Sequence, residues 1–302
     1  MHDNPQSARD ARTFDGVHAL PRHAVIEIAG RDAVAFAQAQ TMNDLAAMPD
    51  GHWHWNGLLT PKGRVVALFA LLRFSSERVW MIVADADPRA LVASLERFVF
   101  RSKVAIRLRR DLLVQGTFAK TTHARGAVIV DVNGVVELDV GGDGGARALR
   151  IAAGVDAEPM ESSVDDTRFA QTWTAYDLAH GWPRLTADQL GAWTPQQLSL
   201  ERLNGYSVKK GCYPGQEIVA RTHFLGKAKR GLILIEGAHG LAAGASLHGG
   251  AGNALGTLVC SVDVATGQSL ALAVVPLQRD AGELTVQCVV VREIALRGGL
   301  AR

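Results

Sequence analysis

The chain has 302 residues, about twice the length of a typical single domain, which predicts two or three hydrophobic cores and excludes a mini-protein. Hydrophobic residues make up 48% and charged residues 21%, which excludes bulk disorder, and a formal net charge of +2 excludes an overall field for indiscriminate nucleic-acid binding. The longest apolar run, residues 65–72, is far shorter than the roughly 20 residues that span a bilayer. The N-terminus lacks the apolar stretch of a secretory signal, so we expect a cytoplasmic protein without membrane contact.

The cysteines argue against cross-links and metal centres. Cys212, Cys260 and Cys288 are an odd number with no close pair, so one chain cannot build a disulfide framework or a four-thiolate metal site. We expect no metal, and we expect Cys260 and Cys288 to be core residues of predicted strands.

The first third of the chain alternates helical and strand patterns. Spacing of apolar residues predicts a helix between residues 30 and 43, and two apolar runs at 64–74 and 78–84 predict a buried hairpin. Asp87 and Pro88 form a typical helix start. The apolar face expected for that helix is Leu91, Val92, Leu95, Phe98 and Val99.

The middle of the chain predicts an antiparallel sheet and two more helices. Asn133 and Gly134 separate two apolar runs as a hairpin turn, and GGDGG at 141–145 is a mobile turn, since it lacks the lysine and hydroxyl of a phosphate loop. A helix is expected over 162–180, with an aromatic stripe that we assign to the core, and another after the capping box of Thr194 and Gln197.

Closely spaced apolar segments after residue 230 predict a separate small β-barrel. The expected fold class is therefore α+β, with antiparallel sheets, helices and a C-terminal barrel. We divide the chain into an α+β domain at 1–110, a second α+β domain at 111–229 and the barrel at 230–302.

The segment 209–221, KKGCYPGQEIVAR, combines groups that carry chemistry and is predicted to be a rigid loop. From 209 to 230 there are six lysines and arginines against the single Glu217. Because cations favour the thiolate, Cys212 is the best candidate for a functional thiol, the alternative being a small buried residue in a tight turn. Glu217 is a candidate partner of Lys210 or Arg221, or of a heterocyclic ligand, and His223 is a candidate base.

This segment also carries a family resemblance. KKGCYPGQEIVAR, preceded by TPQQLSLERLNG and followed by LGKAKRGL, closely resembles the signature of the YgfZ family of folate-binding proteins, relatives of the glycine-cleavage T-protein. FAQAQTMNDL and LLTPKGRVVALF resemble two further segments of that family, so the resemblance covers essentially the whole chain. The family motif falls on Lys210, Gly211, Cys212, Tyr213, Gly215, Gln216 and Glu217, and we add Arg221.

The resemblance implies a three-domain ring of the T-protein type that binds tetrahydrofolate or a one-carbon-substituted folate. It implies a role in assembly or repair of iron–sulfur enzymes, including tRNA-thiolating enzymes, with iron–sulfur assembly proteins or client enzymes as partners. The residues that it suggests for the folate site are Gln40, Asn43, Lys62, Arg64 and Glu217, with Thr41 and Asp44 as further polar lining.

Two other functions are weighed against this one. The first is a folate-dependent aminomethyltransferase, but Leu203 stands where the T-protein carries its folate-orienting glutamate, and no turnover reaction is assigned. The second is RNA binding through Arg101, Lys103, Arg107, Arg109 and Arg110 together with the 209–230 cluster. Direct nucleic-acid binding is not expected, on the reasoning that no aromatic residues are interleaved with these cations.

Overall fold

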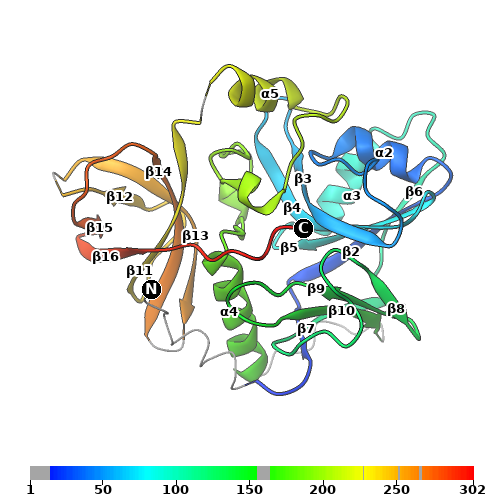
Figure 1. Cartoon of the computed structure of the whole chain (residues 1–302), viewed down its shortest axis with the longest axis horizontal. Helices are drawn as coiled ribbons and strands as arrows, with labels where there is room; N and C mark the ends of the chain where they lie inside the picture. Colours follow the sequence, from blue (N-terminus) through cyan, green and yellow to red (C-terminus); the bar gives the residue numbers. More distant parts are fainter. Residues whose placement is uncertain (1–13, 155–163, 227, 251, 265–266) are drawn as a thin grey trace.

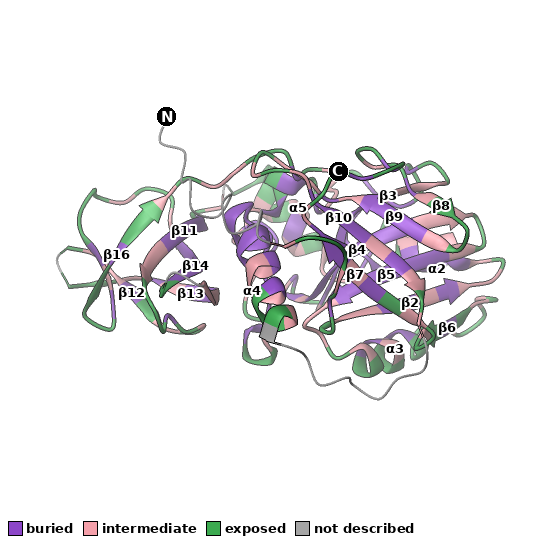
Figure 2. Ribbon diagram, turned by 90° about the horizontal axis from the view of Figure 1, so that it is seen from below, coloured by how far each residue is buried: buried purple, intermediate pink, exposed green. Residues whose placement is uncertain are grey.

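The computed structural model describes residues 14–154, 164–226, 228–250, 252–264 and 267–302. Its strands form two five-stranded antiparallel sheets and a closed six-stranded barrel (Figure 1). In Figure 2 the barrel occupies one end of the molecule and the sheets the other, with helix α4 (Val164–Ala179) between them. The predicted α+β class with a C-terminal barrel is confirmed, whereas the division at residues 110 and 229 stays a prediction.

The first sheet, called the N-terminal sheet below, has the strand order β3-β4-β5-β2-β6. Its strands are β2 (His23–Ala29), β3 (His52–Leu59), β4 (Val65–Ser75), β5 (Arg78–Ala84) and β6 (Ala105–Leu108). Helices α2 (Ala33–Gln40) and α3 (Pro88–Glu96) share a core with Phe69 on one face of β4, while Leu68 on the other face packs in a core with residues of the second sheet. Burial on both faces explains why β4 is a continuous apolar run.

Helix α3 begins as predicted but ends early. The Asp87 carboxylate accepts hydrogen bonds from the backbone N–H of Arg89 (2.9 Å) and Ala90 (3.3 Å), which satisfies two of the free donors of the first turn. The helix ends at Glu96, so the expectation that Phe98 lies on its apolar face is wrong: the chain has already turned, and Phe98 is 46% exposed.

The second sheet has the order β1-β7-β10-β9-β8. Its strands are β1 (His18–Ala19), β7 (Leu112–Thr117), β8 (Val130–Val132), β9 (Val135–Asp139) and β10 (Ala148–Ala153). Asn133 and Gly134 join β8 to β9 with φ of 53° and 78°, the two positive angles of a type I′ hairpin turn, which confirms that prediction.

Helix α4 buries its aromatic stripe against this sheet. Phe169 and Trp173 are almost fully buried, and the Trp173 ring lies over Gly116 of β7. A Cβ atom at Gly116 would lie 2.6 Å from that ring, so only glycine permits this contact.

The helix expected after Thr194 does not form. The capping box exists, since Gln197 N–H donates to Thr194 Oγ1 (3.2 Å) and Thr194 N–H donates to Gln197 Oε1 (3.0 Å). Ser199 then adopts a left-handed conformation (φ 49°), and its hydroxyl accepts the N–H of Leu232 in the barrel (3.0 Å). Between Thr194 and α5 (Gln216–Phe224) the chain therefore forms only turns and the 3₁₀ segment η2 (Leu200–Leu203). An earlier 3₁₀ segment, η1 (Ala187–Gln189), lies before Thr194.

The barrel has the strand order β11-β14-β13-β12-β15-β16. Its strands are β11 (Arg230–Ala238), β12 (Ser246–His248), β13 (Ala254–Val264), β14 (Gln268–Pro276), β15 (Leu284–Val286) and β16 (Val289–Ile294). Cys260 is buried in β13 as predicted. The same expectation for Cys288 is wrong, because Gln287 and Cys288 form the exposed turn between β15 and β16, both with positive φ.

Residues 295–302 leave the barrel and run back over the two sheets (Figure 1). Trp55 donates its indole N–H to the carbonyl of Leu300 (2.7 Å), and Asp143 N–H donates to the carbonyl of Gly298 (3.1 Å). The GGDGG turn at 141–145 is thus held by this segment, not left as the mobile turn that was expected. No helix in the described ranges is long and apolar enough to cross a membrane.

The contact of Gly116 with Trp173 supports a stability prediction. Gly116→Ala should lower the free energy of unfolding by about 1–3 kcal/mol, because the added methyl group has to displace the buried indole. Urea unfolding followed by tryptophan fluorescence measures this, with Gly226→Ala, in open space, as the control. Equal midpoints for the two variants would contradict the tight packing of α4 on β7.

Candidate functional site

The segment 209–221 is fastened to the N-terminal sheet by a buried lysine. Lys210 Nζ donates to the backbone carbonyls of Gln38 (2.5 Å), Thr41 (2.5 Å) and Asn43 (3.1 Å). Burial lowers the pKa of Lys210 to about 8, against the attraction of the Asp44 carboxylate. This cation therefore stabilises the end of α2 and is not presented to solvent.

Most of the other motif residues also serve this scaffold. Tyr213 is buried under Lys210, with Nζ 4.9 Å from the ring centroid, and donates its hydroxyl to Ser207 O (3.2 Å). Gln216 Nε2 donates to Lys210 O (3.0 Å). Gly215 has φ of 80°, and a Cβ there would lie 2.5 Å from Thr60 O, so this position requires glycine.

Of the seven family positions, three remain at the surface, Gly211, Cys212 and Glu217, and the added Arg221 is exposed as well. The alternative that Cys212 is a small buried residue is therefore wrong. The rigid loop ends sooner than expected, because residues 216–224 form helix α5, with Glu217 in its first turn and Arg221 in its last. Among the described residues Glu217 forms no ion pair with Lys210 or Arg221, and His223 forms no hydrogen bond with Cys212.

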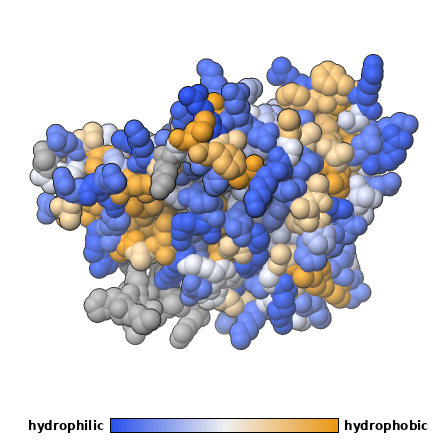
Figure 3. All heavy atoms as spheres, turned by 45° about the horizontal axis from the view of Figure 1, so that its top comes forward, coloured by the Kyte–Doolittle hydropathy of each residue, from blue (hydrophilic) through white to orange (hydrophobic). Residues whose placement is uncertain are grey.

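Helix α5 lies at the top of Figure 1, and its C-terminal end is apolar at the surface. Phe224 is 67% and Leu225 84% exposed. Figure 3, which brings this end forward, has hydrophobic side chains among hydrophilic ones in its upper middle part.

The structure disperses the residues expected to hold folate. Asn43 is buried and donates its amide to the carbonyls of Trp55 (2.8 Å) and Asn204 (2.6 Å), and Arg64 donates to Ala192 O (2.7 Å) and Gln197 Oε1 (3.2 Å). Gln40 is half-buried at the end of α2. Lys62 is exposed in the turn between β3 and β4.

One part of that expected set does come together. Gly63, next to Lys62, lies so close to α5 that an added Cβ would be 2.8 Å from Ile218, the residue after Glu217. The turn that carries Lys62 and the helix that carries Glu217 therefore adjoin, whereas Asn43 and Arg64 support the backbone.

The structure contains a buried network of ion pairs that the sequence analysis did not predict. Asp177 of α4 lies between Arg147 (2.7 Å) and Arg184 (2.9 Å), and Arg184 also pairs with Asp85, which follows β5. The Arg147 guanidinium lies 4.2 Å from the ring centroids of both Trp173 and Tyr176. The signal in the sequence is the presence of two charged residues, Asp177 and Arg184, within the otherwise largely apolar stretch YDLAHGWPRL at 176–185.

An internal cavity adjoins these ion pairs. It measures about 30 Å³, enough for about two water molecules, and lies between the N-terminal sheet, the second sheet and α4. Its walls include Trp55, Trp173 and Trp182, with Arg147 and Asp177 as charged groups. His23 also lines it, and its buried Nδ1 has no hydrogen-bond partner in the described part of the chain. A buried polar atom without a partner indicates a place for water or a ligand.

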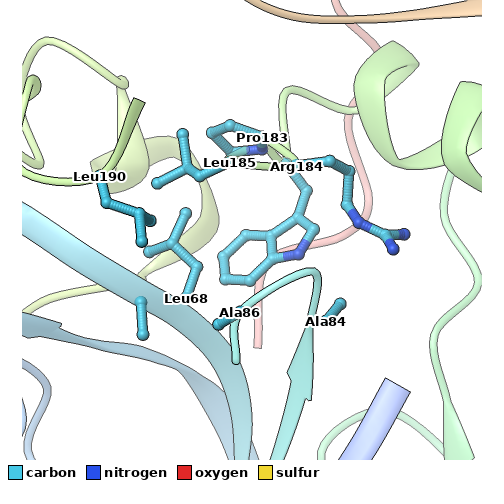
Figure 4. Close-up of a pocket in the computed structure, with 9 residues that line it drawn as sticks. Leu68, Ala84, Ala86, Pro183, Arg184, Leu185 and Leu190 are labelled. Atoms are coloured by element: carbon cyan, nitrogen blue, oxygen red, sulfur yellow. The ribbon is translucent and has the colours of Figure 1, made fainter. Parts of the chain in front are cut away.

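Arg147 also lines a second space, an open cleft of about 710 Å³. Lys120, Arg125 and Arg302 line this cleft together with Asp139 and Asp143. A cleft of this volume is in the range that accommodates small-molecule ligands. The smaller pocket between β4 and residues 182–190 holds only about 10 Å³, and in Figure 4 the Arg184 guanidinium points away from its apolar lining.

Within the described ranges no group of three His, Cys, Asp or Glu side chains is placed to hold a metal ion.

Buried histidine gives a pH prediction. Burial lowers the pKa of His54 to about 4, and the charge of Lys210 acts in the same direction. A histidine in the unfolded chain has a pKa near 6.5. Between pH 4 and 6.5 the folded state therefore binds fewer protons than the unfolded state, and the free energy of unfolding falls as the pH falls. His54 contributes about 3 kcal/mol to that fall. His54→Gln should flatten the dependence of urea midpoints on pH, whereas exposed His123→Gln should not. Identical slopes for the two variants would contradict a neutral buried His54.

Comparisons with known proteins extend the resemblance. The chain matches no protein-family profile. It is 25% identical over 228 residues to the tRNA-modifying protein YgfZ of Colwellia psychrerythraea, covering 72% of this chain and 70% of that one. It is 25% identical over 287 residues to the YgfZ protein of Photobacterium profundum, covering 85% and 82%.

The fold is that of the T-protein. The crystal structure of the glycine cleavage system aminomethyltransferase T from Bartonella henselae superposes with a TM-score of 0.72 at 13% identity, covering 96% of this chain and 88% of that one. The motif-based resemblance is therefore confirmed: this chain is similar to the YgfZ proteins over most of its length and has the fold of the glycine-cleavage T-protein.

Proposed function

We propose that this chain is a folate-binding accessory protein for the assembly or repair of iron–sulfur enzymes, including enzymes that thiolate tRNA. The observation that carries the proposal is that the buried residues of the motif hold the backbone in place around an exposed cysteine. Lys210, Tyr213, Gly215 and Gln216 make buried or close contacts, and Cys212 stands exposed above them. A thiol at the surface on a fixed support suits contact with a metal cluster or a thiol of another protein.

The folate would be tetrahydrofolate or a one-carbon-substituted form. Its planar pteridine matches the tryptophan walls, charged groups and unpartnered His23 Nδ1 of the internal cavity, and its anionic glutamyl tail matches Lys120 and Arg125 of the cleft. Arg147, which lines both spaces, would be the link between them. The internal cavity of about 30 Å³ would have to widen to admit a pteridine, so we infer that binding involves movement of its walls.

Aminomethyl transfer is the second candidate, because the fold is shared with an aminomethyltransferase. That reaction needs an acidic residue that acts as a general acid or base. The carboxylate that lines the internal cavity is Asp177, and it is held between Arg147 and Arg184. Both of its oxygens are engaged by guanidinium groups, Oδ1 by Arg147 and Oδ2 by Arg184, so neither is free to accept a proton from a substrate, which argues for binding without transfer.

The folate proposal is tested by anaerobic calorimetry with tetrahydrofolate carrying one or five glutamates. We expect saturable binding, tighter for the longer tail, and we expect Lys120→Gln/Arg125→Gln to remove that preference. Arg221→Gln, a charge loss on α5, is the control. No binding by the wild-type chain would reject the folate site. A loss of affinity in Glu217→Ala, with the cleft variant unchanged, would move the site to the α5 surface.

The thiol proposal is tested in cells that depend on this chain. Cys212→Ser should abolish the support of an iron–sulfur tRNA-thiolating enzyme, read as thiolated nucleosides in tRNA digests, while the midpoint of thermal unfolding stays unchanged because the side chain is exposed. Cys288→Ser removes the other exposed thiol, on the barrel, and should retain full support. Full support by Cys212→Ser would reject the role of the thiol.

A further inference from the structure

Two phenylalanines project from the turn that follows α3. Phe98 is 46% and Phe100 85% exposed, while Val99 between them packs against the core of the N-terminal sheet. Phe100 N–H donates to Phe98 O (3.1 Å), which closes the turn. Exposure of one large apolar side chain needs no explanation, but here the partly buried Val99 anchors a turn that holds two aromatic rings at the surface.

Cations flank these two phenylalanines along the chain. Between residues 96 and 110 there are six arginines and lysines against one carboxylate, Glu96. Arg97, Arg101 and Arg107 are exposed and form no ion pair within the described part of the chain. Arg109, by contrast, is neutralised by Glu27 (3.0 Å) and Asp111 (2.7 Å).

The backbone that carries these side chains is fixed. Asp32 Oδ2 accepts the N–H of Lys103 (2.7 Å), and Gly30 approaches so closely that a Cβ there would lie 2.3 Å from Lys103 O. Residues 105–108 then form β6, the edge strand of the N-terminal sheet, with Ile106 buried and Arg107 exposed. The surface is therefore ordered in the free protein, which lowers the entropic cost of binding.

We propose that Phe98, Phe100, Arg97, Arg101, Lys103 and Arg107 form a binding surface for single-stranded nucleic acid. Exposed rings provide stacking faces for unpaired bases, and cations beside them neutralise phosphates. Residues two apart along an extended chain are about 6.6 Å apart, which suits successive phosphates of an extended strand better than a flat lipid surface. The sequence-based expectation against nucleic-acid binding rested on the absence of interleaved aromatics, and the exposure of Phe98 and Phe100 removes that premise.

The experiment is fluorescence anisotropy of the full chain with a labelled single-stranded RNA of about 12 nucleotides, a length within the range of known single-strand sites. Phe98→Ala/Phe100→Ala should weaken binding by about 25-fold, since each stacked base contributes about fivefold or more. Arg101→Gln/Arg107→Gln should reduce the slope of log affinity against log salt by about 1.4, because each phosphate contact contributes about 0.7. Circular dichroism checks that the surface variants are folded.

Three comparisons make the result decisive. Phe224→Ala, an exposed aromatic beside the basic residues of α5, is the matched control and should bind like the wild type. The same sequence as a duplex should bind more weakly than the single strand, because its bases are already stacked. Vesicles of phosphatidylserine and phosphatidylcholine should not compete with the RNA.

Each of the following results would overturn the proposal: no binding of the single strand, equal binding by wild type and the Phe98→Ala/Phe100→Ala variant, a loss confined to Phe224→Ala, or binding of vesicles in preference to RNA. The last result would assign the surface to a membrane. Because this test uses neither folate nor the Cys212 thiol, its failure is distinguishable from failure of the proposed function.

Discussion

The association of the two sheets with α4 depends on a set of buried charges. Arg147 precedes β10 in the second sheet, Asp177 belongs to α4, and Asp85 follows β5 in the N-terminal sheet, with Arg184 joining the last two. An unpaired charge in such an interior would cost several kcal/mol, so these segments are stable only when all of them are present together. The network specifies one arrangement of the two sheets more than it adds stability, because the desolvation of each ion offsets much of the attraction.

The same arrangement creates the internal cavity. Tryptophan side chains from β3, α4 and the segment after α4 cannot fill the space beside the ion pairs, and His23 is left with a nitrogen that has no partner in the described part of the chain. The C-terminal segment closes the structure from outside through Trp55 and the 141–145 turn. A ligand at the centre would therefore contact both sheets and α4, which makes its binding sensitive to how they are packed.

The surface around Cys212 and the surface around Phe98 and Phe100 are held in place by different interactions. At the motif, a buried lysine and close glycine contacts hold the backbone so that Cys212 is exposed at a fixed position. At the turn after α3, Val99 and Asp32 hold the backbone so that rings and cations are exposed together. In Figure 1 α5 and α3 lie at different parts of the N-terminal sheet, so a partner at one surface leaves the other free for a second function.

Local patterns in the sequence determine much of this protein. The hairpin at Asn133 and Gly134, the start of α3 at Asp87 and the barrel after residue 230 depend on backbone preferences and alternation within a few residues, so the sequence alone predicts them. The motif likewise identified the correct relatives. Tertiary structure decided the rest: that no helix follows the capping box of Thr194, that Phe98 and Cys288 are exposed, and that Lys210 is buried and holds the end of α2. It also brought Arg147, Asp177, Arg184 and His23 together. Apart from the local turn at Cys288, each of these depends on contacts between residues far apart in the chain, whose free energy exceeds the local preferences and leaves no periodic signal in the sequence.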